Sequence, residues 1–191
     1  MNLKEFGVDY IKRLKNILDN LDYDVIERII DRFEQTVHKK SRIFILGNGG
    51  SAATASHMVN DLGVGLRRRE IINFDITSLA DNTPSSTAIS NDIGYENIFF
   101  MQIKGLLKAD DVVVAISCSG NSANIIKVTD YAKEIGSTII GITGFDGGKL
   151  KQDSDINFHI SADNGEYGLV EDAHMILDHL IYSYYIQKQE S

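Results

Sequence analysis

The sequence has few of the features that mark secreted, membrane or nucleic-acid-binding proteins. A single cysteine, Cys118, excludes a disulfide framework within the chain, and no apolar run approaches the length that crosses a membrane. The formal net charge of −8 argues against general nucleic-acid binding, which needs a basic surface. The first residues are mixed and polar, so we expect no signal peptide and a cytoplasmic protein.

Signs of a domain boundary are equally scarce. The chain has one proline and no low-complexity tract, which argues against linkers. Its 191 residues are enough for one α/β domain with a buried core. We therefore predict a single domain over 1–191, with N-terminal helices in 1–40 and an α/β core in 41–191.

The first forty residues contain two amphipathic helical patterns. Apolar residues recur at three- and four-residue steps in 6–21 and again in 25–37, with a break near 22–24. A hairpin of two such helices cannot bury both apolar stripes against one edge of a sheet. We predict that it contacts the same element of other subunits in a homo-oligomer; the alternative is a helical cap on a monomer.

Beyond residue 40, short apolar stretches alternate with helical patterns. The stretches typical of strands are 43–46, 74–79, 111–116, 138–143 and 156–160. The expected helices are 51–62, 85–90, 98–107, 123–135 and 170–186. This alternation predicts the α/β class: a doubly wound, mostly parallel five-stranded sheet flanked by helices, with the N-terminal hairpin added.

A glycine-rich turn follows the first expected strand. Gly47, Gly49 and Gly50 allow a sharp turn that brings N–H groups close to a ligand, and Ser51 can cap the helix behind it. Because a helix N-terminus favours an anion, the turn predicts a phosphate site. The spacing also satisfies the dinucleotide fingerprint G-x-G-x-x-A, but the acidic residue that should end the second strand comes late, at Asp81.

A loop rich in hydroxyl groups follows the third expected strand. Ser117, Ser119 and Ser122 present donors beside the open N–H groups of a new helix. Each serine alone could be an ordinary cap, but three within six residues favour a ligand. With no lysine in the loop, a phosphomonoester suits it better than a triphosphate, and the two loops predict one crevice. Cys118 also belongs to this loop, as a filler and not a nucleophile, because no histidine is near it in the sequence.

Histidines and carboxylates on two expected helices are suited to acid–base chemistry. His57 and Asp61 are four residues apart and face the same way. The last helix supplies Glu171, Asp172, His174, Asp178 and His179. Moving a proton between C1 and C2 of an aldose–ketose pair needs a base and an acid, roles that imidazole and carboxylate fill near neutral pH. For any one histidine alone, packing or solvent exposure is the alternative.

Together these motifs are similar to a known family. Strand-Gly-Asn-Gly-Gly-Ser-helix, followed by Ile-Ser-x-Ser-Gly-Asn-Ser-x-Asn, resembles the sugar isomerase (SIS) domain and, more closely, the phosphoheptose isomerases. These enzymes convert sedoheptulose 7-phosphate to D-glycero-D-manno-heptose 7-phosphate for envelope or capsule polysaccharides. The resemblance covers nearly the whole chain and implies a homotetramer with active sites at subunit interfaces. It implies that Ser51, Ser117, Ser119 and Ser122 hold the phosphate and that Asn48, Gly49, Gly50, Asn91 and Asp92 line the sugar. We also expect Cys118 and Glu171 to lie among the substrate-binding residues.

The resemblance also implies a metal. His57, Asp61, Glu171 and His179 occupy the positions where heptose isomerases bind zinc, which would polarise the sugar oxygens. Asp61 and His179 would be the acid–base pair. Glu171 and His179 are eight residues apart, about 12 Å along an ideal helix, so they share a metal only if their side chains lean together. His174 is the reserve ligand.

Three positions depart from the family pattern. Asp61 stands where glutamate is usual, Glu171 where glutamine is usual, and Gly65 where an arginine is expected. Glu171 is therefore either a stronger metal ligand or a catalytic base that compensates for the short Asp61. Two alternatives stay open: an isomerase of hexose or pentose phosphates, and a non-catalytic SIS tetramer that binds a sugar phosphate or a replication-initiator protein.

Overall fold

The chain folds around a five-stranded sheet in which every strand pairs in parallel with its neighbours. The computed structural model describes residues 2–190. The strands are β1 (Ile43–Gly47), β2 (Ile76–Ser78), β3 (Val112–Ser117), β4 (Thr138–Gly144) and β5 (Ile156–Ile160). Their spatial order is β2-β1-β3-β4-β5. The predicted strands and fold class are confirmed, although β2 keeps only three of the six residues expected in 74–79.

The strand order creates a switch point between β1 and β3. From β1 the chain moves outward to β2 and then returns to the other side of β1, so the connections after β1 and β3 run in opposite directions. In register, Ile43 of β1 pairs with Val112 of β3 and Gly47 with Ile116. Open α/β sheets bind ligands at the carboxyl ends of strands at such a point. Both predicted phosphate loops begin there.

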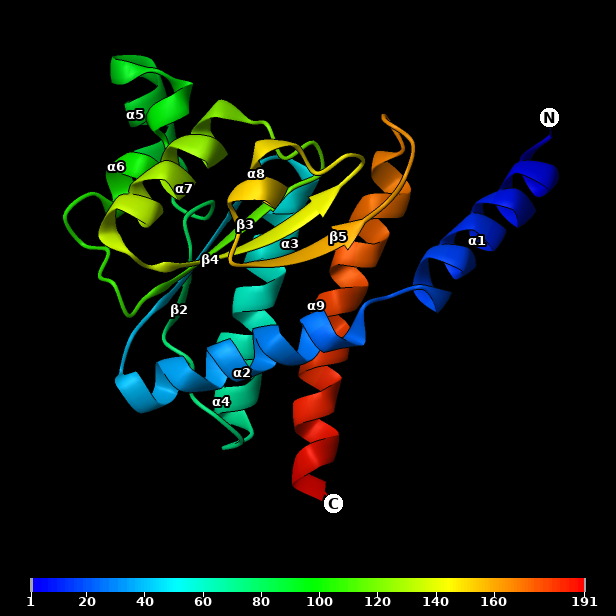
Figure 1. The fold of residues 1–191 in the computed structure, drawn as a ribbon, viewed down its shortest axis with the longest axis horizontal. Helices are drawn as coiled ribbons and strands as arrows, with labels where there is room; N and C mark the ends of the chain where they lie inside the picture. The colour runs from blue at the N-terminus through cyan, green and yellow to red at the C-terminus, as the bar shows by residue number, and fades with distance from the viewer. Residues whose placement is uncertain (1, 191) are drawn as a thin grey trace.

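Helices cover both faces of the sheet (Figure 1). They are α1 (Leu3–Asp19), α2 (Tyr23–Lys39), α3 (Gly50–Met58), α4 (Leu66–Arg68), α5 (Thr83–Ile93), α6 (Phe100–Ile103), α7 (Ala123–Ile135), α8 (Gly148–Asp153) and α9 (Tyr167–Glu190). Within the described residues, no helix combines the length and apolar character that a membrane crossing needs.

Alternating side chains of β1 explain the two covered faces. Ile43 and Ile45 belong to the apolar cluster that α2, α3 and α9 complete, whereas Phe44 and Leu46 belong to the cluster on the α7 side. Successive residues of a strand point to opposite faces, and all of β1 is buried. An apolar run without a polar break is therefore what a strand between two helical layers requires.

The segment after α3 is wider than an α-helix. The predicted helix 51–62 is α-helical only as far as Met58, and a π-helix, η1 (Val59–Gly65), follows. A Cβ at Gly63 would lie 2.6 Å from Ile76 Cγ2, so the missing side chain allows η1 to approach β2 closely. π-Helical turns are rare and frequent at functional sites, and this one contains Asp61.

The two predicted N-terminal helices are present, and they diverge. α2 buries Ile26, Ile29 and Phe33 against the sheet, whereas α1 buries no residue and points away from the body (Figure 1). The helices do not fold back on each other as the expected hairpin would. Instead α1 contacts the start of α9, where the Tyr10 hydroxyl donates to Asp172 Oδ2 at 2.6 Å.

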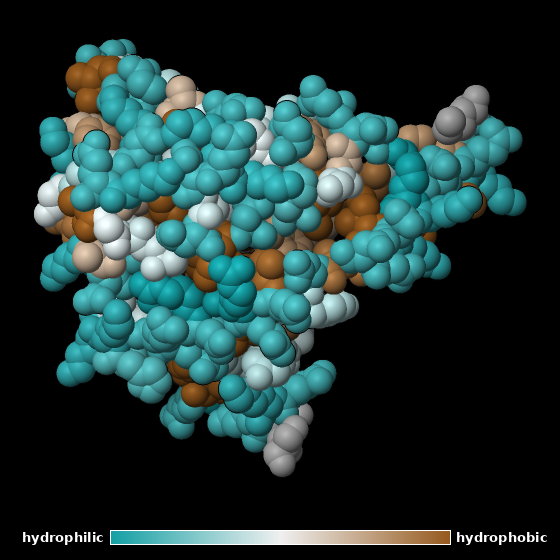
Figure 2. Space-filling model, in the orientation of Figure 1, coloured by the Kyte–Doolittle hydropathy of each residue, from teal (hydrophilic) through white to brown (hydrophobic). Residues whose placement is uncertain are grey.

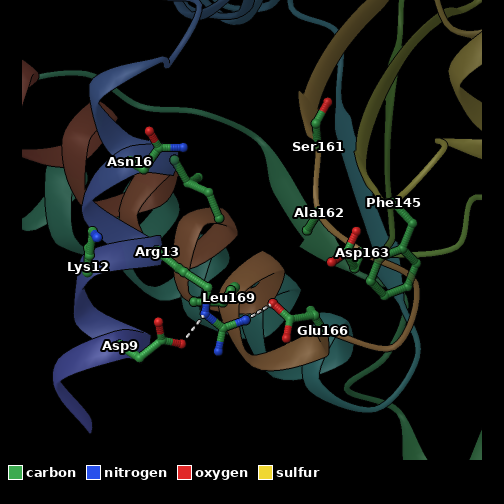
Figure 3. A pocket seen from close by; sticks show the side chains of 11 residues that line it. Asp9, Lys12, Arg13, Asn16, Phe145, Ser161, Ala162, Asp163, Glu166 and Leu169 are labelled. Atoms are coloured by element: carbon green, nitrogen blue, oxygen red, sulfur yellow. Dashed lines mark hydrogen bonds and ion pairs between the residues drawn. The ribbon is translucent and has the colours of Figure 1, made fainter. Parts of the chain in front are cut away.

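A cavity of about 610 Å³ separates α1 from the loop that leads into α9. Figure 3 shows Arg13 at its edge, between Asp9 of the same helix and Glu166 of the facing loop. The Arg13–Glu166 ion pair fastens α1 to this loop, and Ile17 near the end of the helix packs against the core. The apolar side chains nearer its start, Leu3, Phe6, Val8 and Ile11, stay exposed in the single chain.

Two further helical segments differ from expectation. The helix predicted over 98–107 is reduced to α6, preceded by a 3₁₀ turn, η2 (Tyr95–Asn97). After β4 the chain forms the short helix α8, which the sequence pattern did not predict. The Leu150 N–H of α8 donates to the Gly120 carbonyl at 2.9 Å. α8 thereby holds the serine loop that follows β3.

Candidate active site

The loops after β1 and β3 meet around one small cavity of about 130 Å³. Ser51 from the first loop and Ser117, Ser119 and Ser122 from the second all line it. The other lining residues are Asn48, Ile116, Cys118, Tyr167 and Glu171. α3 and α7 begin at this cavity, so two helix N-termini face it, an arrangement that favours an anion.

The serine hydroxyls remain able to donate to such an anion. Ser117 Oγ accepts from the Gly120 N–H at 3.1 Å, which leaves its own proton free. Ser122 is the N-cap of α7, yet its side chain makes no capping hydrogen bond. The Ser122 side chain therefore does not act as an ordinary helix cap.

Gly120 makes the tight turn of the serine loop possible. Its φ is +64°, and a Cβ there would lie 1.9 Å from the Gly147 carbonyl oxygen. Only glycine combines this backbone conformation with so close an approach. The serine loop and the start of α8 thus form one compact unit.

Asn48 is held in place by two residues that the sequence analysis did not assign. Its amide exchanges hydrogen bonds with the Asn124 amide at 2.9 and 2.8 Å, and the Tyr95 hydroxyl donates to Asn48 Oδ1 at 2.8 Å. Asn124 is the last residue of the quoted serine motif, so a signal for it was present. Asn91 and Asp92, predicted to line the sugar, lie exposed at the end of α5 and are not among the lining residues of the cavity.

Cys118 is a buried free thiol in this cavity. Burial, with a further contribution from the charge of Glu171, raises its pKa to about 11. The thiol is therefore protonated near neutral pH, and a protonated thiol is a poor nucleophile. This agrees with its expected role as filler.

A second group of polar side chains lies between α3–η1 and α9. His57, Asp61, Asp178 and His179 each offer one potential ligand atom, and these atoms lie within 4.8 Å of one another. His57 Nε2 is 3.2 Å from His179 Nε2 and 3.5 Å from Asp61 Oδ2. Imidazole nitrogen and carboxylate oxygen are ligands that zinc accepts, so the group fits a divalent metal ion.

Asp178 is the unexpected member of this group. Its side chain is 0% exposed, and neither carboxylate oxygen has a hydrogen-bond partner. Burial, followed by the charge of Asp61, raises its pKa to about 7. A buried, unsatisfied carboxylate is destabilising unless a cation or donor compensates it.

Glu171 lies apart from this group. A Cβ added to Gly50 would lie 2.4 Å from its carboxylate atoms, so the carboxylate rests against the start of α3, and it lines the cavity between the two loops. The structure does not bring Glu171 to His57, Asp61 and His179; Asp178 is there instead. The physical reason is the separation of eight residues along α9, about 12 Å.

His174, the expected reserve ligand, is a core residue. Its Nε2 lies 3.2 Å from the Thr143 carbonyl oxygen, and its ring is 6.5 Å from that of Phe158. Burial lowers its pKa to about 4. His174 is therefore neutral in the folded chain near neutral pH and contributes to packing.

The low pKa of His174 predicts a loss of stability in acid. The neutral His174 ring contributes fully to the stability of the fold above the unfolded-state pKa of 6.5, and this stability is lost as the pH falls towards about 4. The lowering of the His174 pKa from 6.5 to about 4 corresponds to about 3 kcal/mol of unfolding free energy. Denaturant unfolding at pH 7, 5.5 and 4 should show this loss relative to His174→Gln, whose amide is neutral throughout. Protonation of Asp178 at low pH changes stability in the opposite direction, but it does so equally in both proteins and drops out of the comparison. Parallel curves of unfolding free energy against pH would contradict the prediction.

Comparison with known proteins assigns the family. The SIS domain family model matches residues 9–144. A phosphoheptose isomerase of Helicobacter pylori is 33% identical over 178 residues, which cover 93% of this chain and 90% of that protein. The chain belongs to the phosphoheptose isomerases of the SIS family.

Other phosphoheptose isomerases agree with this assignment. A probable member from Thermoplasma acidophilum is 37% identical over 162 residues, covering 85% of this chain and 87% of that protein. The solved phosphoheptose isomerase of Neisseria gonorrhoeae superposes with a TM-score of 0.84 at 26% identity, covering 97% of this chain and all of that one. The enzyme from Francisella tularensis, at 22% identity, shares the fold with a TM-score of 0.82.

Proposed function

We propose that this chain interconverts sedoheptulose 7-phosphate and D-glycero-D-manno-heptose 7-phosphate by acid–base proton transfer through an enediol. One observation carries the proposal: α3 and α9 each contribute both to the phosphate cavity and to the His/Asp group. Ser51 and His57 on α3 are six residues apart, about 9 Å along the helix. Six backbone bonds separate C1 from C7 of an extended heptose, a span of about 8 Å.

The residues divide into two roles under this proposal. The serine hydroxyls and the helix N-termini bind the phosphate and fix the position of the sugar. His179 and Asp61 then move the proton between C1 and C2, one as base and one as acid. We propose zinc as the metal, with His57, Asp61 and His179 among its ligands; when bound, it polarises the sugar oxygens.

Isotope exchange tests the function directly. With sedoheptulose 7-phosphate in deuterium oxide, the purified chain should incorporate deuterium at C1 or C2 and form the aldose. A panel of hexose and pentose ketose phosphates is the control for chain length, and faster turnover of a shorter sugar would change the proposed substrate. No exchange with any ketose phosphate would favour the non-catalytic alternative, which the names of the relatives do not support.

Glu171→Gln should separate phosphate binding from catalysis. The carboxylate lies in the cavity proposed for a phosphate dianion, and like charges a few ångströms apart repel by about 1–2 kcal/mol even in water. Removing the charge should lower KM by roughly tenfold and change kcat little. Steady-state kinetics of both proteins is the measurement. A fall of kcat by two orders of magnitude would instead make Glu171 the base.

We propose that α1 contacts further copies of the chain in a homotetramer with active sites at the interfaces. Its apolar side chains Leu3, Phe6, Val8 and Ile11 are 47–86% exposed. Figure 2 shows apolar surface gathered where α1 joins the body. A helix of this length is marginally stable alone, so burial of this face supplies what the single chain lacks. We propose accordingly that residues 1–40 serve oligomerisation and that 41–191 form the core of the domain. We also propose a cytoplasmic location.

A paired substitution tests the assembly. Val8→Glu with Ile11→Glu should convert the oligomer to smaller species, because charges would be buried at the contact. Light scattering coupled to size exclusion gives the mass. Leu106→Glu, at another exposed apolar residue, is the control and should leave the mass unchanged. A monomeric parent chain would refute the proposal.

A further inference from the structure

Asp178 is an ionisable side chain that is buried with no hydrogen bond from the described residues to compensate its charge. It is fully buried on α9, and both of its oxygens lack a hydrogen-bond donor. Within residues 2–190, His57 is the only cationic side chain recorded at ion-pair distance, with Nε2 3.8 Å from Asp178 Oδ2. Retaining a carboxylate in such a place is unfavourable unless something else binds it.

The neighbours of Asp178 indicate what binds it. Its carboxylate faces His57, Asp61 and His179, and one atom from each of the four lies within 4.8 Å of the others. Two imidazole nitrogens and two carboxylate oxygens are four ligand atoms of the kinds that zinc accepts. Their two negative charges would also neutralise the ion in a partly buried site.

Glu171 occupies a different position. Its carboxylate lies against Gly50 and lines the cavity with Ser51, Ser117, Ser119 and Ser122. To reach the His/Asp group it would have to leave the start of α3. The resemblance to the family gave this residue the role of metal ligand, but its contacts are those of a group in the phosphate cavity.

We propose that Asp178 is the fourth metal ligand of this chain and that Glu171 is not a ligand. The inference rests on the metal of the proposed function. It identifies a ligand set of His57, Asp61, Asp178 and His179 in which adjacent residues of α9 both bind the ion. Glu171 then remains beside the phosphate, where it influences substrate binding.

Zinc affinity, measured without substrate, is the first test. Asp178→Asn keeps the shape of the side chain and removes its charge, and it should weaken zinc binding at least 100-fold in competition with a chromophoric chelator. Glu171→Ala, which removes every ligand atom from the side chain that resemblance makes a ligand, should change the affinity less than threefold. Asp172→Asn removes the same charge from an exposed position of α9 and is the matched control.

Thermal stability is the second test and separates a ligand from a structural residue. Asp178→Leu replaces the unsatisfied carboxylate with an apolar side chain of similar size, so the metal-free variant should melt at a higher temperature than the metal-free parent. Added zinc should raise the melting temperature of the parent and have little effect on the variant. A purely structural Asp178 would instead give lower melting temperatures both with and without zinc.

The outcomes distinguish this inference from the proposed function. Unchanged zinc affinity in Asp178→Asn, a large loss in Glu171→Ala, or a parent chain that binds no zinc would each overturn the inference. If zinc binding depends on Asp178 but no ketose phosphate is turned over, the proposed function fails and the ligand assignment stands.

Discussion

His179→Ala is expected to lower kcat for sedoheptulose 7-phosphate by about 10²–10⁴-fold, the range that general acid–base groups contribute. His179 Nε2 lies 3.2 Å from His57 Nε2, in the group where a metal and the reacting carbons of the sugar would meet. The side chain is exposed, so its truncation should leave the fold intact. The cavity proposed for the phosphate does not include His179, and KM should therefore change much less than kcat.

Three measurements make this prediction specific. Deuterium exchange at C1 or C2 should disappear together with turnover, and zinc content determined by elemental analysis shows whether the metal is lost as well. Circular dichroism checks the fold. His38→Ala, at an exposed histidine of α2, is the matched control and should retain full activity. Wild-type exchange in His179→Ala would remove this residue from the mechanism.

The double variant Ser119→Ala/Ser122→Ala should raise KM by two orders of magnitude or more. Both hydroxyls line the cavity proposed for the phosphate, and the Ser122 side chain makes no capping bond. A hydrogen bond to a charged group contributes about 1.5–3 kcal/mol, so the loss of two corresponds to at least about 3 kcal/mol. The proton-transfer residues are untouched, and kcat at saturation should fall by less than tenfold.

Binding of inorganic phosphate by calorimetry is the direct measurement, and it should weaken in parallel with KM. Ser154→Ala is the control, because Ser154 lies just before β5, at the amino ends of the strands, and its hydroxyl donates to the Leu150 carbonyl. If the double variant bound phosphate as tightly as the parent, the cavity would not be the phosphate site.

Much of the fold could be predicted because local signals and burial agree. The helix expected over 123–135 is α7, and Gly136 ends it in the left-handed conformation with φ +80°. β1 and β3 are uninterrupted apolar runs, and both are buried along their whole length. In such segments the same residues determine the local conformation and the packing, so the sequence pattern is sufficient.

The π-helix η1 could not be predicted, because its cause lies in distant residues. Gly63 allows η1 to approach Ile76 of β2, and a Cβ on Gly65 would lie 3.0 Å from the Tyr182 ring of α9. Neither contact is visible in the spacing of residues 59–65. The α-helical periodicity that predicted 51–62 continues into a segment whose geometry is determined by tertiary packing.

The site residues divide in the same way. Glycines and serines at strand ends mark in the sequence the cavity proposed for the phosphate, since the topology of a parallel sheet brings such loops together. The residues of α9 are different: Glu171, His174, Asp178 and His179 lie on one helix, and its packing against α3 decides which of them meets His57. Spacing alone therefore could not choose between Glu171 and Asp178.

The contact between Gly50 and Glu171 has a consequence for how this enzyme can vary. The space that a larger residue 50 would need is filled by the carboxylate of residue 171, 2.4 Å from an added Cβ. The two positions are coupled: an alanine at 50 is tolerated once the side chain at 171 is shortened or turned away, and the paired change costs less than the sum of the single ones. Which residues are acceptable at position 50 therefore depends on the residue at position 171, and the reverse also holds.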